Sequence, residues 1–224
     1  MSPKLALIHT SPSLIPVFQA LCATWLPGVE VFHMVDESLI RNTIAAGRLE
    51  KITMRRVISL VDSARLAGAD AVLVTCSSIG DAVTTAATLF DFPVIRVDDA
   101  LAEKAVTIGN RIGVLATVRT TLEPTTAQVR RMACKSTSCK DITIVEVLCD
   151  GAFDAVMSGD GLTHDDIVSA ALLKLIPRVD VVVLAQASMA RVLATIDPAA
   201  LTVPVLSSPE LAVQCVAEVL RSGR

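Results

Sequence analysis

Two stretches of the chain decide its fold: Asp70-Ala-Val-Leu-Val-Thr-Cys-Ser-Ser78 and Asp180-Val-Val-Val-Leu-Ala-Gln-Ala-Ser188. Each begins with an aspartate, continues with four apolar residues and ends in small or polar side chains. An unbroken apolar run of this length is typical of a strand that is covered on both faces in a parallel sheet. We therefore expect the same strand in both halves of the chain, followed by polar strand ends at residues 76–78 and 186–188.

Three further pairs of segments repeat in the same order. They are Leu7-Ile-His-Thr10 with Val114-Leu-Ala-Thr117, Val31-Phe-His-Met-Val-Asp36 with Val145-Glu-Val-Leu-Cys-Asp150, and Phe92-Pro-Val-Ile95 with Val203-Pro-Val-Leu206. Any one match could arise by chance because buried strands look alike, but four in sequential order indicate a duplication. We predict two similar lobes related by a pseudo-twofold axis, residues 1–98 with 207–224 and residues 99–206.

Apolar, β-rich runs alternate with helical patterns along the whole chain. The expected strands are 4–8, 29–35, 71–75, 94–97, 112–116, 142–148, 179–185 and 203–206. Helices fit between them: residues 49–67 end at Gly68, Thr163 with Asp166 resembles a capping box, and Ser208 with the following proline and glutamate starts the last helix. This alternation predicts an α/β fold, with a parallel sheet and right-handed crossovers in each Rossmann-like lobe.

The composition excludes several classes of protein. Of 224 residues 52% are hydrophobic, 19% are charged and 3% are aromatic, and the formal net charge is −3. Such a chain folds, but it has neither the basic surface nor the aromatic platforms of a nucleic-acid-binding protein. The uncharged stretch 5–29 contains three prolines and His9, so it is neither a spanning helix nor a signal peptide. We expect a soluble, cytoplasmic protein that binds no nucleic acid and no membrane.

The six cysteines do not form a metal-binding pattern. They stand at positions 22, 76, 134, 139, 149 and 215 without a C-x-x-C pair, and the closest two, Cys134 and Cys139, have no histidine nearby. We therefore predict no metal site and expect most thiols to be reduced and packed. Because nucleotide-binding glycine motifs are also missing from the sequence, we predict a reaction without cofactor.

The polar strand ends predict where a ligand binds. In open α/β sheets ligands bind outside the carboxyl ends of the strands, so two facing lobes would enclose one small site between them. Its walls would be the loops 9–13, 36–38, 76–78, 117–121, 150–151 and 186–188, in which Arg119 is the one arginine. Short hydroxyls and backbone N–H groups suit a small carboxylate.

Cys76 is the strongest candidate for chemistry. It follows an apolar run and begins a helix-like segment, where the helix dipole and unpaired N–H groups favour a thiolate. A thiol that ionises in this way can act as a base or a nucleophile. His9, at the end of the first strand, could orient or deprotonate a partner, and Cys149 is a minor candidate. We expect His33 to be structural and His164 to be a solvated residue of a first helical turn.

Two repeated α/β lobes, the Val-Thr-Cys-Ser-Ser element ending at Ser78 and the segment Asn110-Arg-Ile-Gly-Val-Leu-Ala-Thr117 resemble the aspartate/glutamate/hydantoin racemase superfamily over nearly the whole chain. The resemblance implies cofactor-independent chemistry at the carbon next to a carboxylate, and a homodimer or higher homo-oligomer. It implies that Cys76 is the first of two catalytic thiols. The small carboxylic-acid substrate would be held by polar residues of the loops, namely Thr10, Ser11, Ser77, Ser78, Thr117, Thr120, Thr121, Ala187 and Ser188.

The sequence departs from this family at the second thiol, because Leu184-Ala185 is followed by Gln186. A glutamine cannot relay a proton as a thiol does, although it can donate hydrogen bonds to an oxyanion. Three hypotheses stay open. The first is a one-thiol enzyme that isomerises, epimerises or decarboxylates a small acid, as the family's maleate isomerases and arylmalonate decarboxylases do. The second is a racemase in which His9 or Cys149 replaces the second thiol, and the third is a small-acid binding protein without catalysis.

Overall fold

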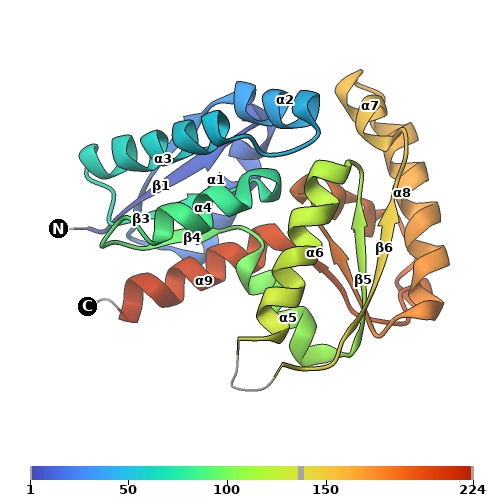
Figure 1. Ribbon diagram of the computed structural model, residues 1–224. Coiled ribbons are helices and arrows are strands. Elements are labelled where there is room, and N and C mark those ends of the chain that lie inside the picture. Colours follow the sequence, from blue (N-terminus) through green and yellow to red (C-terminus); the bar gives the residue numbers. More distant parts are fainter. Residues whose placement is uncertain (1, 136–138, 223–224) are drawn as a thin grey trace. The chain divides into compact units, whose positions relative to one another are not determined.

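The computed structural model describes residues 2–135 and 139–222 (Figure 1). Within these residues the chain divides into two units, residues 1–100 with 209–224 and residues 101–208. Each boundary lies two residues beyond the one predicted from the sequence. Each unit contains one parallel sheet of four strands that is surrounded by helices, so the α/β architecture predicted from the repeats is confirmed.

Unit 1 is built on a sheet of strand order β2-β1-β3-β4. Its strands are β1 (Lys4–His9), β2 (Glu30–Val35), β3 (Ala71–Val74) and β4 (Val94–Arg96). Its helices are η1 (Pro12–Leu14), α1 (Ile15–Trp25), α2 (Glu37–Ala46), α3 (Lys51–Leu66), η2 (Ser77–Ile79), α4 (Gly80–Ala87) and α9 (Ser208–Ser222), where η marks a 3-10 helix.

Unit 2 repeats this topology with the strand order β6-β5-β7-β8. Its strands are β5 (Arg111–Ala116), β6 (Thr143–Leu148), β7 (Val181–Leu184) and β8 (Val205–Ser207). Its helices are α5 (Asp99–Ile108), α6 (Arg119–Ala133), α7 (Ala152–Met157), α8 (Gly161–Leu175), η3 (Ile176–Arg178), η4 (Ala187–Ala194) and η5 (Pro198–Ala200). All eight expected strands are thus present, although most are shorter than the apolar runs that predicted them.

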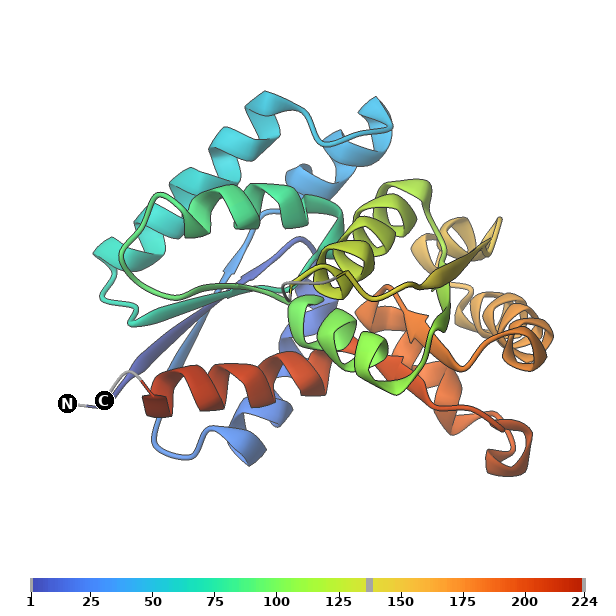
Figure 2. The ribbon, with the colours of Figure 1, turned by 60° about the horizontal axis from the view of Figure 1, so that its bottom comes forward.

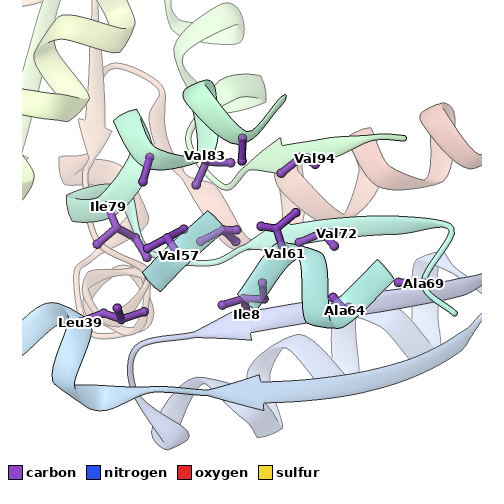
Figure 3. Packing of buried hydrophobic residues seen from close by; sticks show 14 residues of the cluster. Ile8, Leu39, Val57, Val61, Ala64, Ala69, Val72, Ile79, Val83 and Val94 are labelled. Atoms are coloured by element: carbon purple, nitrogen blue, oxygen red, sulfur yellow. The ribbon is translucent and has the colours of Figure 1, made fainter. Parts of the chain in front are cut away.

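The sheet of unit 1 is covered on both faces, which explains the continuous apolar runs. Along β3, Val72 and Val74 pack with α3 and α4, and Figure 3 shows these helices bringing Val57, Val61 and Val83 onto that face. The alternate residues Ala71 and Leu73 pack on the opposite side with α1 and α9. Figure 2 shows this three-layer arrangement, with the red α9 on one side of the sheet and the green α4 on the other.

Unit 2 is layered in the same way. Leu115, Val182 and Leu184 of its central strands pack with α8, η3 and η4, and α6 packs against β5 and β6. The helices after β4 and β8 are exchanged between the two units. Most of α5, which follows β4, belongs to unit 2, and most of α9, which follows β8, belongs to unit 1.

The pairing registers correct one of the four sequence matches. Lys4 pairs with Glu30 in unit 1 and the equivalent Arg111 pairs with Thr143 in unit 2, so β2 and β6 are 113 residues apart rather than 114. The match of Asp36 with Asp150 was therefore wrong by one residue, and Asp36 corresponds to Cys149. Half-buried edge strands carry a weak apolar pattern, which explains why this register could slip by one residue.

One further prediction about local structure is corrected. The cap of α8 is Asp160, whose carboxylate accepts a hydrogen bond from the Thr163 N–H at 3.0 Å, so Thr163 lies inside the helix instead of starting it. Cys134 and Cys139 form a disulfide, whereas the other four of the six cysteines are free, which agrees with the expectation that most thiols are reduced. Among the helices of the described residues, none has both the length and the apolar character that a membrane crossing requires.

Small and large side chains are exchanged between the two cores. Ala6 of β1 corresponds to Gly113 of β5 by register. The last buried residue of α3, which packs over this face in unit 1, is Ala64. The last buried residue of α8 in unit 2 is Leu175. A Cβ atom on Gly113 would lie 2.7 Å from Cδ2 of Leu175. Because Gly113 has no side chain, the larger leucine fills the space next to it.

We predict that Gly113→Ala destabilises the protein by about 1–3 kcal/mol, because the added methyl group overpacks a fully buried contact. The matched background is Leu175→Ala, in which the same glycine substitution should cost much less because the leucine methyl groups are gone. Urea unfolding of the two single variants and the double variant gives the coupling free energy. Equal costs of Gly113→Ala in both backgrounds would contradict this account.

Candidate functional site

Cys76 stands where strand β3 passes into a helix. It follows Thr75 after the strand and is the N-terminal cap of η2, which runs directly into α4. Side chains alternate along a strand, so Cys76 faces the same side of the sheet as Val72 and Val74. It packs against their apolar cluster and is half-buried. The predicted position of this thiol at a strand end and a helix start is thus what the structure shows.

Four groups of unit 1 donate hydrogen bonds that stabilise the thiolate form of Cys76. They are the hydroxyl of Thr10, the hydroxyl and backbone N–H of Ser78, and the backbone N–H of Ile79. Thr10 reaches the sulfur because β1 and β3 are adjacent, with Ile8 paired to Val74. The donors therefore come from two strand ends and from the first turn of η2.

Burial nevertheless raises the pKa of the Cys76 thiol above its ordinary value, and the four hydrogen bonds offset this only in part. The helix start favours the thiolate as expected, but desolvation of the charged form is the larger effect on the pKa of Cys76. At neutral pH the group is a thiol, which can give a proton, and its thiolate form has donors already in place.

The equivalent position in unit 2 is held by Gln186, the N-terminal cap of η4. Its Oε1 accepts a hydrogen bond from the backbone N–H of Thr117 at 2.6 Å and from the Thr117 hydroxyl at 2.9 Å. The registers make Thr117 the counterpart of Thr10. Equivalent threonines thus donate to the residue that follows the third strand by two positions in each unit. Thr10 donates to the sulfur of Cys76, and Thr117 donates to the amide oxygen of Gln186. With Oε1 fixed in this way, the amide nitrogen of Gln186 remains a donor.

His9 lies in a relay of hydrogen-bonded side chains on the other face of the unit 1 sheet, which runs from the buried Thr75 through the half-buried His33 to the exposed Gln19. Its Nδ1 is 2.8 Å from the Thr75 hydroxyl and its Nε2 is 2.9 Å from Nδ1 of His33. Nε2 of His33 is 2.7 Å from the amide oxygen of Gln19, which can only accept, so His33 donates there. If His33 is neutral, His9 then donates to His33 and accepts from Thr75.

This relay separates His9 from Cys76. Burial, together with the neighbouring His33, lowers the pKa of His9 to about 4, so the ring is neutral at pH 7. Its ring packs against Phe18, which belongs to the cluster on the α1 and α9 side of the sheet. The structure therefore brings Thr10 to the sulfur of Cys76, and it engages both nitrogens of His9 elsewhere.

The other predicted site residues fall into three groups. Ser77 is buried in η2 beside Ser78, whereas Ser11 pairs with Ser13 through hydroxyls 2.8 Å apart at an exposed turn. Thr120 and Thr121 are buried in the first turn of α6, and Ala187 and Ser188 begin η4. Cys149 is buried, and burial followed by the charge of Asp150 raises the pKa of its thiol to about 11.

Two polar clusters were not found from the sequence. His164 is fully buried, against the prediction of a solvated residue, and its Nδ1 is 2.8 Å from Asp165, which also accepts a bond from Arg191. Arg96, at the end of β4, is buried among carboxylates of unit 1. In residues 2–135 and 139–222, no group of three or more His, Cys, Asp or Glu side chains is placed to hold a metal ion.

Comparison with known proteins agrees with this fold. The model of the Asp/Glu/Hydantoin racemase family matches residues 7–216, so the chain belongs to that family. Family and fold together indicate a racemase- or isomerase-type enzyme. A search of curated protein sequences gave no match.

Solved structures of racemases share the fold at low sequence identity. An allantoin racemase from Klebsiella pneumoniae is 18% identical with a TM-score of 0.74, covering 99% of this chain and 89% of its own. A glutamate racemase from Bacillus anthracis is 16% identical with a TM-score of 0.73, covering 99% and 82%. An aspartate racemase from Picrophilus torridus is 14% identical with a TM-score of 0.70, covering 98% and 94%.

We predict that Thr10→Val slows alkylation of Cys76 by iodoacetamide at pH 8 roughly tenfold, because losing one donor to the thiolate raises the thiol pKa by about one unit. Thr10→Ser keeps the hydroxyl and should react as the wild type does. Thr117→Val removes the equivalent hydroxyl in unit 2 and is the matched control. Mass spectrometry of the Cys76 peptide measures the rates, and an unchanged rate in Thr10→Val would contradict this role of the threonine.

The relay of His9 predicts a loss of stability in acid. The pKa of His9 is about 4 in the folded protein against 6.5 for the free side chain, so the unfolded chain binds the extra proton between these values. The free energy of unfolding should therefore fall as pH drops from 6.5 to 4, by about 2 kcal/mol after allowance for screening. Urea unfolding of the wild type and His9→Gln across this range tests this, since the variant should lose most of that slope.

Proposed function

We propose that the protein is a cofactor-independent isomerase-type enzyme that acts on the carbon next to the carboxylate of a small acid. Cys76 is the group that exchanges a proton with that carbon or bonds to it. The observation that carries this proposal is the position of Cys76 as the N-terminal cap of η2, where hydrogen bonds from Thr10, Ser78 and Ile79 favour the thiolate. A buried thiol has no structural need for so many donors, whereas a thiolate formed during turnover does.

Gln186 contributes to the same reaction as a hydrogen-bond donor. Its amide oxygen is taken by Thr117 at 2.6 and 2.9 Å, which orients the NH₂ group away from those bonds. When a proton or CO₂ leaves the carbon beside a carboxylate, negative charge collects on the carboxylate oxygens. A fixed amide N–H can stabilise that charge without changing its own protonation state.

The substrate carboxylate is the ligand that the remaining predicted residues suit. Ser77, Ser78, Thr120 and Thr121 are hydroxyl-bearing residues in the first turns of helices, where backbone N–H groups also point outward, and Thr117 directly follows β5. Thr10, Ser11, Ala187 and Ser188 complete the proposed set, the last two through backbone groups and one hydroxyl.

One-sided proton transfer follows from these two residues. A thiolate at Cys76 can remove the α-proton and return one to the same face, but Gln186 has no proton to deliver to the opposite face. The two replacements considered for a second thiol are poorly suited, since both nitrogens of His9 are bonded and the pKa of Cys149 is raised to about 11. The proposal therefore favours exchange or isomerisation without racemisation.

Decarboxylation is the second candidate, and one observation favours it. The raised pKa of Cys76 keeps a proton on the sulfur at neutral pH. Loss of CO₂ from a malonate-type acid leaves an enediolate that needs one proton on one face, which the Cys76 thiol can give. The resulting thiolate would be held by the donors described above until it is reprotonated from solvent.

The decisive experiment follows the α-proton in D₂O by NMR with optical rotation alongside, over a panel of amino acids, hydroxy acids, hydantoins, malonates and maleate. We expect exchange without inversion, isomerisation or CO₂ release for at least one acid, abolished in Cys76→Ser. Cys215→Ser is the matched control, because it removes another half-buried thiol of unit 1 and should stay active. Gln186→Cys should gain racemisation of an acid that the wild type only exchanges.

Three results would contradict the proposal in different ways. Activity that survives Cys76→Ser would remove the thiol from the mechanism. Inversion by the wild type would mean that a second proton donor exists. Protection of Cys76 from alkylation by small carboxylates, with no turnover of any, would support the alternative of a non-catalytic acid-binding protein.

We also propose that the protein works in the cytoplasm as a homodimer or higher homo-oligomer, without nucleic acid or membrane as partner. A net charge of −3 and 3% aromatic residues support the absence of a nucleic-acid partner, and the family resemblance, with which the large apolar content is compatible, supports the homo-oligomer.

A further inference from the structure

Arg96 forms the most extensive buried ionic network of unit 1. It is the last residue of β4 and is 3% exposed. Its Nε and Nη2 donate to the two carboxylate oxygens of Asp98 at 3.0 and 2.9 Å, and Asp98 is itself fully buried. Asp81 and Asp99 lie 3.3 and 3.8 Å from the guanidinium. Burial alone would lower the pKa of Arg96, and the three carboxylates raise it. The charge is therefore permanent.

The same guanidinium also contacts residues at the start of α4. Its Nη1 donates to the hydroxyl of Thr84 at 3.0 Å and to Asp81, which lie one turn apart on that helix. The first residue of α4 is Gly80, and a Cβ atom there would come closer than 3.0 Å to three guanidinium atoms. Because Gly80 has no side chain, the guanidinium of Arg96 can pack directly against it.

Gly80 directly follows two residues whose backbone N–H groups donate hydrogen bonds to the sulfur of Cys76. Ser78 and Ile79, whose backbone N–H groups donate to the sulfur of Cys76, immediately precede Gly80. Any shift of the start of α4 relative to β3 moves these two N–H groups. Arg96 belongs to β4, which pairs with β3, so it ties the helix start to the sheet that carries the cysteine.

The duplication provides an internal comparison. By register Arg96 corresponds to Ser207, and counting on from Cys76 and Gln186 without a gap places Ala190 at the position of Gly80. The unit that has no thiol at the third-strand end therefore lacks both the arginine and the glycine that makes room for it. The segment after Gln186 is also a 3-10 helix, whereas Gly80–Ala87 is a regular α-helix. Generic packing of this fold thus does not require the pair.

We propose that Arg96 is a positioning residue for Cys76: by packing on Gly80 and binding Asp81 and Thr84, it holds the backbone N–H groups that receive the thiolate. This role deepens the proposed function, because it matters only for a thiol that ionises. It acts through geometry, since Asp98 offsets the charge of the arginine within the network.

The test is the pH profile of Cys76 alkylation by iodoacetamide, followed by mass spectrometry with Cys215 as the reference thiol in the same molecule. Arg96→Met should raise the apparent pKa of Cys76 by about one unit and slow its alkylation at pH 8 about tenfold. Arg96→Lys should rescue it only in part, because an ammonium group cannot bind Asp98 through two parallel bonds. The matched control is Arg65→Met, whose side chain bonds the carbonyl of Ala69 after α3.

Gly80→Ala keeps Arg96 and its carboxylate partners in the chain but displaces the guanidinium from the start of α4, so it separates positioning from loss of the arginine. It should shift the Cys76 profile in the same direction, with thermal unfolding showing that the variant is folded. A folded Arg96→Met or Gly80→Ala with the wild-type profile overturns the proposal. The readout needs no substrate, so it remains decisive even if Cys76→Ser retains activity and the proposed function fails.

Discussion

The adjacency of the first and third strands is the constraint on which the candidate site depends. Because β1 and β3 pair in parallel with Ile8 opposite Val74, the residues two positions further on, Thr10 and Cys76, meet at the carboxyl edge of the sheet. The same register in unit 2 brings Thr117 to Gln186. A threonine that donates to the third-strand residue is thus a property of the duplicated sheet. What differs between the two units is the acceptor, a sulfur in one and an amide oxygen in the other.

Two opposing effects set the state of the thiol. Burial against the α3 and α4 cluster disfavours the thiolate, while hydroxyl and backbone donors favour it, and burial is the larger effect. A site of this kind keeps its proton at rest and still stabilises the anion when a reaction produces it. Donors that are fixed by strand pairing and by the start of α4 need little reorganisation at that moment, which is where preorganised hydrogen bonds contribute most to catalysis.

The sequence predicted the features that follow from apolar periodicity and failed where long-range polar contacts decide. Eight strands, the duplicated topology and the placement of Cys76 at a helix start follow from buried runs that end in small residues. The half-buried β2 and β6 carry a weaker pattern, so their match slipped by one residue. The contact of Arg191 with Asp165 beside the buried His164 and the lowered pKa of His9 depend on neighbours contributed by other elements. No local signal connects Arg96 with Gly80, which are 16 residues apart and belong to different elements.

The loss of symmetry between the units extends beyond one residue. Cys76, Gly80 and Arg96 of unit 1 correspond to Gln186, Ala190 and Ser207 of unit 2, so the acceptor, the glycine and the arginine differ together, while both units have a threonine donor. An amide oxygen carries no titratable charge. Holding backbone N–H donors in exact positions around it therefore adds little stabilisation. A thiolate in a desolvated position loses much of its stabilisation if one donor drifts. Unit 1 contains the titrating group, Cys76. It is therefore the unit in which the ionic network of Arg96, by fixing the start of α4, can stabilise a charged form.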